Sequence, residues 1–371
     1  MIPTSHYHDP AVFRDEMERL FSGYQFVALL SELSNDRDFV CLDLPGLPLV
    51  IQNFKGEIKA FRNVCSHRFT KIQFEDKGNR PLACRYHGWS YDSTGFPYGM
   101  PKREEYELPD GPRGLCLTEY KIETCGQFVF VNLGTNQPLA DFLGRFHASL
   151  EEMSPHIGAL IHYDTVSHAA NWKILVENVL DNFHCALLHR ETFIAFGFCK
   201  LPLEDIVVEG SHSSFHVPRS PSDNEKLRRR AFSHLDRRGY AHDSFFHIHI
   251  FPNFFVASNE GMSFYVGHAV PVGPDRTILR VRYFEPALQF SPSERTRQDL
   301  VNLQTRSNGL KVIEEDRPIL EQVQQGVEGA DKPGVVATSE VRIRAFLEQY
   351  TARMGPVAVE SSSATHKPPV R

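Results

Sequence analysis

Two short stretches of the sequence each carry one cysteine and one histidine, the residue types that bind soft or borderline metal ions. Cys65 and His67 form a Cys-x-His pair, and Cys84 and His87 form a Cys-x-x-His pair after the sixteen intervening residues 68–83. Each pair follows a run of residues with high strand propensity, so we expect both in turns between strands. Two facing loops of this kind would direct two thiolates and two imidazoles at one point.

A set of two thiolates and two imidazoles suits either a tetrahedral zinc ion or a Rieske-type cluster of two irons and two sulfides, in which two histidines replace two cysteines on one iron. Structural zinc sites usually use a pair of closely spaced cysteines followed by a pair of histidines. Here each loop supplies one residue of each type, which favours the two-iron cluster. Gly88 directly after His87 permits the tight turn that such a loop needs. Four unrelated buried residues are the alternative without a metal.

A second group of potential ligands lies in NWKILVENVLDNFHCALLH, residues 171–189, whose apolar spacing predicts a helix over residues 171–188. On a regular helix one face would carry two acids, an imidazole and a leucine, namely Glu177, Asp181, His184 and Leu188. His189 lies five residues beyond His184 and would point about 140° away. If both imidazoles bind one metal, the helix must loosen or end between Cys185 and Leu188, as a single-turn π-bulge would allow.

Two histidines and one carboxylate around open coordination positions form the facial triad of iron(II) oxygenases. The carboxylate could be Asp181, which is close in sequence, or an acid of the helix predicted over residues 293–327, which carries Glu314, Glu315, Asp316 and Glu321. A histidine taken alone is more often a core or surface residue, and the chain contains 18 of them. The combination of this segment with two upstream Cys/His pairs is what favours a second metal centre.

The segments CSHRFTKI and CRYHGWSYD resemble the Rieske loops of ring-hydroxylating oxygenases. Respiratory Rieske proteins have a further cysteine in each loop, where this chain has Thr70 and Tyr86, so their disulfide cannot form here. The oxygenases usually have glycine after the His-Arg of the first loop, whereas this chain has Phe69. The segment that begins with Asn171 resembles the mononuclear-iron helix of the same family, and EEDRPILEQVQQG resembles its late helix. The resemblance covers about residues 24–354.

The resemblance implies a set of ligands and roles. A Rieske cluster would be bound by Cys65, His67, Cys84 and His87, and a mononuclear Fe(II) by His184, His189 and Asp316. Asp181, with Asn178 in the same catalytic motif, would be the family's bridging carboxylate. It would contact His184 and, across a subunit boundary, His87 of the partner subunit. A head-to-tail ring, most simply a homotrimer, is therefore expected, and the presence of a β-subunit stays open.

The resemblance also implies a terminal oxygenase that uses O₂ to hydroxylate a small organic substrate. No Gly-rich flavin- or nicotinamide-binding motif follows a predicted strand, so a separate reductase or ferredoxin would supply the electrons. Mono- or dihydroxylation of an aromatic or other apolar molecule and oxidative N- or O-demethylation are all open. The rival interpretations are a Rieske electron-transfer protein without oxygenase activity and a zinc-stabilised binding module.

The substrate pocket is less clearly marked. The candidates surround the iron motif or share one face of the strand-like run FHIHIFPNFFV: Phe183, Leu188, Phe196, His247, His249 and Phe251. They would predict a cavity for an aromatic or apolar substrate, although ordinary core packing is the more common role for residues of these types. The basic run at residues 226–238 would either dock an acidic redox partner or be a solvated surface segment.

The order of predicted elements indicates an α+β fold. Residues 1–37 are expected to form a helical segment that packs on the catalytic domain, and residues 38–150 a small all-β Rieske domain. Residues 151–355 would form a larger catalytic domain with an antiparallel sheet flanked by helices, of the helix-grip type. The tail, residues 356–371, is expected to be disordered. Helices are predicted over residues 9–22, 142–161, 171–188, 293–327 and 339–354.

Bulk properties exclude some classes of protein. The 371 residues carry a net charge of −6, which argues against a general nucleic-acid binder. No apolar run is long enough to cross a bilayer, and the first residues lack the order of a secretory signal. The seven cysteines are scattered and odd in number, which does not suggest a disulfide framework. A cytoplasmic protein without membrane association is expected.

Overall fold

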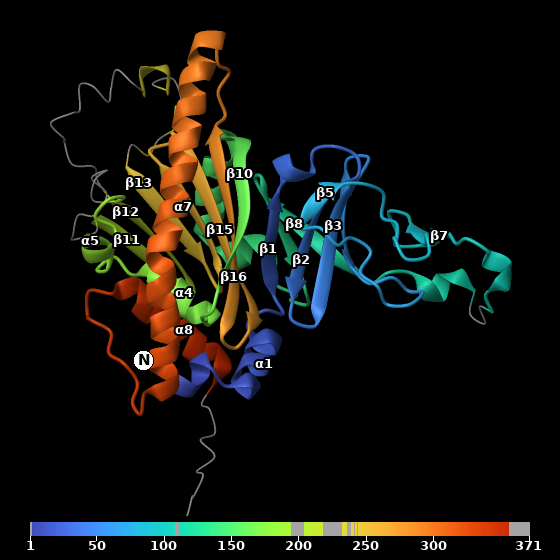
Figure 1. Cartoon of the computed structure of the whole chain (residues 1–371), viewed down its shortest axis with the longest axis horizontal. Coiled ribbons are helices and arrows are strands. Elements are labelled where there is room, and N and C mark those ends of the chain that lie inside the picture. The colour runs from blue at the N-terminus through green and yellow to red at the C-terminus, as the bar shows by residue number, and fades with distance from the viewer. Residues whose placement is uncertain are drawn as a thin grey trace, which may run out of the picture.

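The computed structural model of the protein describes residues 2–107, 111–193, 204–217, 232–235, 239–240, 242 and 244–355. Within these residues, two seven-stranded antiparallel sheets lie side by side, and the long helix α7 crosses the second of them (Figure 1). The tail 356–371, Phe196 and the basic run except residues 232–235 lie outside the described residues. In the described ranges, no helix is both long and apolar enough to cross a membrane.

The first sheet contains the β domain expected from the sequence. Its strand order is β1-β9-β8-β4-β3-β2-β5, and a separate two-stranded sheet, β6-β7, follows the second Cys/His pair. Pairing with β9 brings β1 into this sheet, although β1 precedes residue 38. The strands are β1 Tyr24–Leu29, β2 Asp38–Leu44, β3 Leu47–Phe54, β4 Glu57–Arg62, β5 Lys77–Asn79, β6 Ser90–Tyr91, β7 Pro97–Gly99, β8 Glu119–Cys125 and β9 Phe128–Asn132.

The second sheet has the order β10-β16-β15-β14-β13-β12-β11. Its β12 to β16 pair as successive antiparallel neighbours, and β10 pairs with β16 at one edge. The strands are β10 Ile157–His168, β11 Glu204–Glu209, β12 His212–Val217, β13 Phe245–Ile250, β14 Phe254–Asn259, β15 Ser263–Gly273 and β16 Arg276–Pro286. One face of this sheet contacts α4, α7 and α8 and is called the helix-covered face below.

The helices match the α+β prediction. They are α1 Pro10–Arg19, α2 Leu139–Leu143, α3 Phe146–Met153, α4 Trp172–Leu180, α5 Cys185–Leu188, α7 Pro292–Gly329 and α8 Val341–Met354. Short 3₁₀ turns are η1 Thr4–Tyr7, η2 Leu30–Leu33, η3 Arg103–Glu105, η4 Pro112–Leu115, η5 Ser154–His156 and η6 Ser233–Leu235. The face of the second sheet opposite the helices packs against β1, β9, α2 and α3, where Phe26 stacks on Phe254 at 4.2 Å between ring centroids.

The single helix predicted over residues 142–161 is wrong. The chain forms α2 and α3, leaves the helical conformation after η5, and enters β10 at Ile157. Pairing with β16 along β10 outweighs the local helical pattern. Gly158 lies so close to β16 that a Cβ there would come within 2.7 Å of the Pro286 carbonyl oxygen. Sheet pairing therefore decides the structure of this segment, not local propensity.

A fully buried ion pair fixes helix α4, which leads to the predicted iron motif. Lys173 Nζ lies 2.5 Å from Glu16 Oε1 of α1, and both side chains have no exposed surface. The other oxygen of Glu16 accepts a hydrogen bond from Trp172 Nε1 at 2.8 Å, and Tyr350 of α8 donates to Oε1 at 2.7 Å. A buried charge is costly unless it is paired and hydrogen-bonded. This network therefore fixes the positions of α1, α4 and α8 relative to one another.

A second buried ion pair joins the two sheets. Arg282 of β16 donates from Nε to Glu32 Oε2 at 2.7 Å, and Lys77 of β5 lies 2.9 Å from the other oxygen. Arg280 donates to the Cys41 carbonyl at 2.6 Å and to Asp76 at 2.9 Å. The β domain and the catalytic sheet are thus held together by charged contacts of two buried arginines of β16.

Helix α7 approaches the sheet closely at one glycine, and this contact gives a stability prediction. A Cβ at Gly309 would overlap the hydroxyl and ring of Tyr283, whose side chain is buried. We expect Gly309→Ala to lower the free energy of unfolding by about 1–3 kcal/mol because of overpacking. Gly326→Ala on the same helix is the matched control, since nothing lies within 4 Å of its added Cβ.

The control should be neutral or up to about 1 kcal/mol more stable, because alanine favours helix over glycine. Urea unfolding followed by circular dichroism measures both variants. Equal stabilities of the two variants would show that α7 can move away from Tyr283 at no cost.

Candidate metal centres

The two Cys/His loops have the same backbone geometry. In the first, Phe69 N donates to Cys65 O at 3.0 Å and Cys65 N to Thr70 O at 2.8 Å. In the second, Gly88 N donates to Cys84 O at 3.0 Å and Cys84 N to Trp89 O at 2.8 Å. The fourth residue after each cysteine is left-handed, with φ of 62° at Phe69 and 75° at Gly88. Phenylalanine therefore adopts the conformation that glycine adopts freely, and the loop shape is kept at a steric cost.

The four potential cluster ligands come together between these loops. Cys65 and Cys84 are buried, and the rings of His67 and His87 lie 4.5 Å apart between centroids. His67 Nδ1 is buried and has no hydrogen-bond partner in the described part of the chain, as expected of an atom that binds a metal. Burial and the neighbouring His87 lower the pKa of His67, which keeps its imidazole neutral and able to bind a metal. The residues present therefore fit a Rieske cluster.

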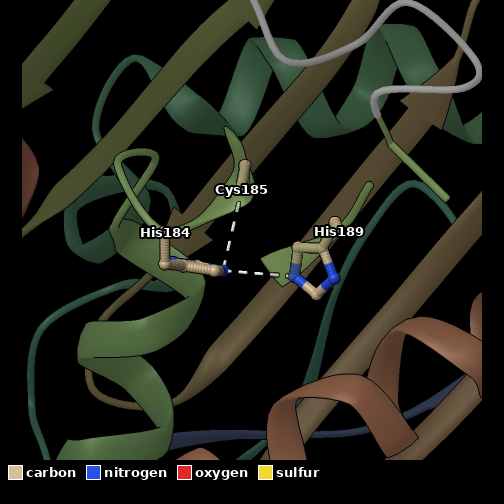
Figure 2. A group of neighbouring side chains, drawn as sticks. All are labelled: His184, Cys185 and His189. Carbon is tan, nitrogen blue, oxygen red and sulfur yellow. Dashed lines mark hydrogen bonds between the residues drawn. The ribbon is translucent and has the colours of Figure 1, made fainter. Parts of the chain in front are cut away.

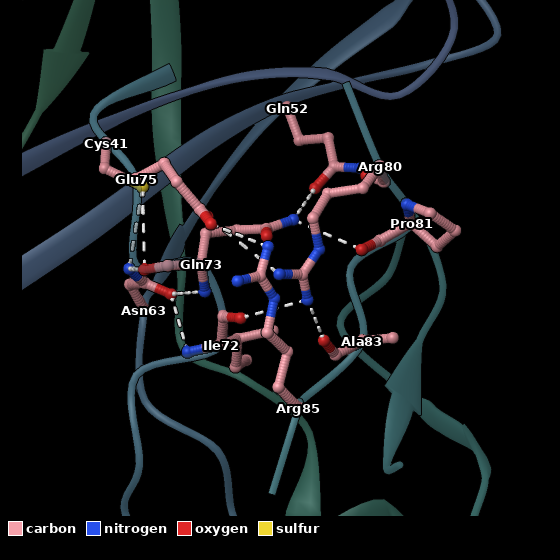
Figure 3. Close-up of polar contacts among 10 residues, drawn as sticks. All are labelled: Cys41, Gln52, Asn63, Ile72, Gln73, Glu75, Arg80, Pro81, Ala83 and Arg85. Carbon is pink, nitrogen blue, oxygen red and sulfur yellow. Dashed lines mark hydrogen bonds and ion pairs between the residues drawn. The ribbon is translucent and has the colours of Figure 1, made fainter. Parts of the chain in front are cut away.

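Polar side chains behind the loops tie them to each other (Figure 3). Asn63 Oδ1 accepts from the backbone N–H groups of Ile72 and Gln73 at 3.0 and 2.9 Å. Gln73 Nε2 donates to the Pro81 carbonyl at 3.2 Å, which links the first loop to the start of the second. Arg80 donates to the Ala83 carbonyl in the second loop and, at 3.4 Å, to the Ile72 carbonyl in the first. This network sets the separation of the two ligand loops.

The helix expected over residues 171–188 is interrupted, so the shared face predicted for Glu177, Asp181, His184 and Leu188 does not exist. Helix α4 ends at Leu180, Asp181 is extended with ψ of 134°, and α5 begins only after His184. The break thus lies before His184, not between Cys185 and Leu188. Asp181 Oδ1 accepts from Phe183 N at 2.7 Å, a local hydrogen bond that competes with helix continuation.

Three ligand atoms converge beside this break. His184 Nε2 and His189 Nε2 are 3.2 Å apart, and Asp316 Oδ1 of α7 lies 3.7 and 3.2 Å from them. Figure 2 shows the two imidazoles directed at each other. Metal bonds of about 2.1 Å at near right angles place ligand atoms about 3 Å apart. Asp316 Oδ1 is buried without a hydrogen-bond partner among the residues that the structure describes, so these three side chains fit a metal ion.

Each of the two imidazoles also has a carboxylate at its other nitrogen. Asp181 Oδ2 lies 3.0 Å from His184 Nδ1, and Glu315 Oε2 lies 2.7 Å from His189 Nδ1. Glu315 also accepts from Thr192 Oγ1 at 2.8 Å. Burial raises the pKa of Asp181, but the hydrogen bonds from His184 and Phe183 outweigh it and lower the pKa overall. Carboxylates in these places fix the tautomer that presents Nε2 to a metal.

Two features of this centre were not assigned from the sequence. Glu315 appeared only as one of several acids, and its contact with His189 depends on how α7 packs. Cys185 Sγ, His184 and His189 offer ligand atoms that all lie within 4.8 Å of one another (Figure 2). Adjacency to His184 was the only signal for Cys185. Asn178 is half-buried on the last turn of α4, and its carbonyl accepts from Asp181 N at 3.2 Å.

The residues predicted to line a pocket fall in different places. Phe183 is 42% exposed and Leu188 is half-buried, whereas His247, His249 and Phe251 are buried. His247 and His249 lie on the helix-covered face, where His249 contacts Phe346 of α8. Aromatic rings connect this face with the metal centre, since Phe193 lies 5.0 Å from His189 and 6.5 Å from Phe245 between centroids. Their contact with substrate stays a prediction.

Comparison with known proteins identifies both halves of the chain. Residues 23–121 match the model of the Rieske [2Fe-2S] domain, and residues 157–356 match that of the ring hydroxylating alpha subunit (catalytic domain). The anthranilate 1,2-dioxygenase large subunit of Burkholderia cepacia is 27% identical, over 95% of this chain and 93% of that protein. The glycine betaine monooxygenase oxygenase subunit of Pseudomonas aeruginosa (strain UCBPP-PA14) is 28% identical over 51% of this chain.

The chain spans about half the length of that last relative, because the match covers 45% of it. The crystal structure of a naphthalene 1,2-dioxygenase variant bound to phenanthrene has the same fold, with a TM-score of 0.76 and 21% identity over 95% of this chain and 92% of that one. The two family models imply a Rieske cluster and a mononuclear iron. Together with the two ligand sets described above, they establish that the chain belongs to the family of Rieske ring-hydroxylating oxygenase α-subunits.

Proposed function

We propose that the chain is a terminal oxygenase that uses O₂ and electrons from a separate donor to oxidise a small organic substrate. The proposal rests on the convergence of His184 Nε2, His189 Nε2 and Asp316 Oδ1. This donor set is that of iron(II) oxygenases, which keep coordination positions open for reactants. A Rieske electron-transfer protein would have no use for such a site, which disfavours that rival.

The chain's residues would hold two separate metal groups, each with its own chemistry. When bound, the cluster supplies single electrons and the iron supplies reactivity toward O₂. Asp181 and Glu315 would hold the Nδ1 protons of the iron-binding imidazoles, so that both rings present Nε2. The cluster would be held by Cys65, His67, Cys84 and His87, and the iron by His184, His189 and Asp316.

We favour hydroxylation, with one or two oxygen atoms inserted, of an aromatic or other apolar molecule in aromatic catabolism. Phe193 and Phe245 support this choice because they continue from His189 toward the helix-covered face. The relatives support two substrate classes, since one acts on anthranilate, an aromatic acid, and the other on glycine betaine, a quaternary ammonium compound. Oxidative N- or O-demethylation is therefore the alternative reaction.

We further propose a head-to-tail homotrimer in which the cluster of one copy faces the iron site of the next. Beside the cluster, Phe69 is 79% and Tyr86 60% exposed. Near Asp181, Phe183 is 42% and Leu187 74% exposed. These two apolar surfaces suit mutual burial between copies. Asp181 would then lie between His184 and the partner subunit's His87, and the arrangement requires no β-subunit.

Phe69 offers a specific test of this assembly. We expect Phe69→Gly to keep the cluster, because glycine adopts the left-handed conformation of this position without strain. Loss of a buried phenylalanine at the interface should weaken association roughly tenfold or more. Sedimentation velocity measures the association, and the visible spectrum of the cluster controls for loop integrity. Unchanged association with an intact cluster would place Phe69 outside the interface.

We propose a reductase or ferredoxin as the electron donor and the cytoplasm as the compartment. Cys41, Cys65, Cys84, Cys116 and Cys125 are free thiols, which suits a reducing compartment. No part of the proposed site requires a nucleic acid or a membrane.

Metal analysis and turnover together test the proposed function. The purified protein should be brown and contain iron with acid-labile sulfide, whereas a zinc-stabilised module would be colourless. With a surrogate reductase, O₂ consumption should depend on a substrate from a panel of aromatic acids and methylated amines. Iron and sulfide without substrate-dependent O₂ consumption across that panel would favour the electron-transfer rival.

A further inference from the structure

Arg342 in the first turn of α8 is a buried cation on the helix-covered face. Its side chain is 2% exposed and extends to β12 and β13. Nε donates to Ser213 Oγ at 3.0 Å, Nη2 donates to His247 Nδ1 at 3.1 Å, and the guanidinium carbon lies 4.7 Å from the centroid of the Phe215 ring. Nη1 is buried and has no hydrogen-bond partner among the described residues. One edge of the guanidinium is therefore unsatisfied.

No acid among the described residues compensates this charge. The buried Arg282 and Arg280 of β16 are paired with Glu32 and Asp76, but Arg342 contacts only neutral groups. Burial lowers the pKa of Arg342 to about 9, so the group stays charged at neutral pH. An unpaired buried charge is strongly destabilising, which makes its retention a sign of a missing anion.

The neighbouring His247 adds a second unsatisfied donor. Burial and Arg342 hold the pKa of His247 well below its ordinary value, so the imidazole is neutral. Because its Nδ1 accepts the hydrogen bond from Arg342, the proton of the ring is on Nε2. His247 Nε2 is also buried and has no hydrogen-bond partner within the described ranges. Two contacting side chains thus each carry a buried donor that lacks an acceptor in the part of the chain that the structure describes.

The sheet register relates these donors to the iron site. His247, Ala257, Tyr265 and Tyr283 form one row across β13 to β16. Tyr265 is close enough to Asp316 for that carboxylate to add to burial in raising the pKa of the phenol. Two strand spacings, about 10 Å, separate His247 from Tyr265, and only the methyl group of Ala257 stands between them in the row. Arg342 and the iron ligands therefore lie on the same face of the sheet.

We infer that Arg342, with His247, binds the anionic group of the substrate, so that the enzyme acts on small aromatic or apolar carboxylates or sulfonates. The inference rests on the proposed oxygenase function and narrows its substrate class. A carboxylate or sulfonate would accept from Arg342 Nη1 and neutralise the buried charge, while Phe215 and Phe245 would line the apolar part. A cationic substrate without an acidic group would be repelled.

Binding of benzoate and benzenesulfonate to the iron-loaded holoenzyme tests the inference, with uncharged benzamide as the comparison. Isothermal titration calorimetry should show that the wild type binds at least one of the two anions more tightly than benzamide. Arg342→Gln should weaken anion binding at least tenfold and leave benzamide binding unchanged. Arg344→Gln is the matched control, because Arg344 is exposed on the same helix. Equal anion binding by wild type and Arg342→Gln would overturn the inference, as would wild type that binds neither anion.

A second variant separates binding from a structural role. Arg342→Met should raise the melting temperature in the absence of anion, because it removes an uncompensated buried charge. Benzoate should raise the melting temperature of the wild type only. A lower melting temperature of Arg342→Met would mean that the guanidinium supports the fold, which contradicts the inference.

O₂ consumption shows whether the bound anion is a substrate or an effector, and it also tests the proposed oxygenase function. If benzoate binds through Arg342 and is itself oxidised, the anion is the substrate. If it binds through Arg342 but only stimulates oxidation of an uncharged aromatic, it is an effector, and the inferred substrate class is wrong. Anion binding through Arg342 without any O₂ consumption by iron-loaded protein would refute the proposed function and leave the anion site standing.

Discussion

Replacing Asp316 by alanine is expected to remove the mononuclear iron and leave the Rieske cluster in place. Asp316 supplies the only carboxylate oxygen of the described residues that faces both His184 Nε2 and His189 Nε2. Two imidazoles alone bind iron(II) weakly, because oxygen ligands suit this metal and three protein ligands complete the triad. Iron should therefore fall from about three atoms to about two per chain, and substrate-dependent O₂ consumption should be lost.

Two neighbouring acids provide controls on the same helix. Glu315→Gln keeps the three ligand atoms but weakens the hold on His189 Nδ1, so iron affinity should fall by roughly 10–100-fold. Glu314→Gln should change nothing, because Glu314 is exposed and its ion pair is with Arg317, away from the ligand atoms. Iron content and the visible spectrum of the cluster are measured for all three variants. A full iron complement in Asp316→Ala would mean that another carboxylate completes the site.

The first metal centre could be predicted almost entirely from the sequence. Its four ligands lie within 23 residues, 65–87, and the loops are stabilised by their own backbone hydrogen bonds. Local spacing therefore determines the geometry. The sequence departs from the family pattern at Phe69, where glycine is usual. The loop nevertheless keeps its shape, because Phe69 adopts the left-handed conformation with φ of 62°.

The second centre could be predicted only in part, because long-range packing assembles it. The histidines were identified, but the helix was expected to continue to residue 188, whereas the hydrogen bond from Phe183 N to Asp181 ends it after Leu180. From spacing alone Asp181 and the acids of the late helix were equal candidates for the third ligand. The close approach of α7 at Gly309 brings Asp316 to the nitrogens, and no local pattern encodes that approach.

The unpaired charge of Arg342 was also invisible in the sequence. An arginine in an amphipathic helix is normally solvated, and its burial depends on Ser213 and His247, which lie about a hundred residues away. The absence of an acid partner among the described residues can be recognised only from the folded structure. Sequence patterns thus predict chemistry within a loop or a helix turn, whereas specificity arises from contacts between distant elements.

Replacing Asp181 by alanine is expected to separate the two metal centres functionally while both remain occupied. Asp181 is not one of the three converging ligands, so the iron site should still fill when Fe(II) is supplied in excess, although the lost hydrogen bond should weaken iron affinity as in Glu315→Gln. What the variant loses is the acceptor at His184 Nδ1 and, in the proposed trimer, the polar link to His87 of the partner subunit. Electron transfer from cluster to iron site should slow by about a hundredfold, the upper end of the range for loss of such outer ligand contacts.

A single-turnover experiment measures this step directly. The cluster is reduced chemically, substrate and O₂ are added, and reoxidation is followed by the visible spectrum. Wild type should reoxidise rapidly, whereas Asp181→Ala should stay reduced despite a full iron content. Glu191→Gln is the control, because Glu191 is an exposed acid two residues from His189 in sequence that pairs with Lys311. Reoxidation of Asp181→Ala at the wild-type rate would show that electrons reach the iron by another path, since removing the carboxylate would then have left the route between the centres intact.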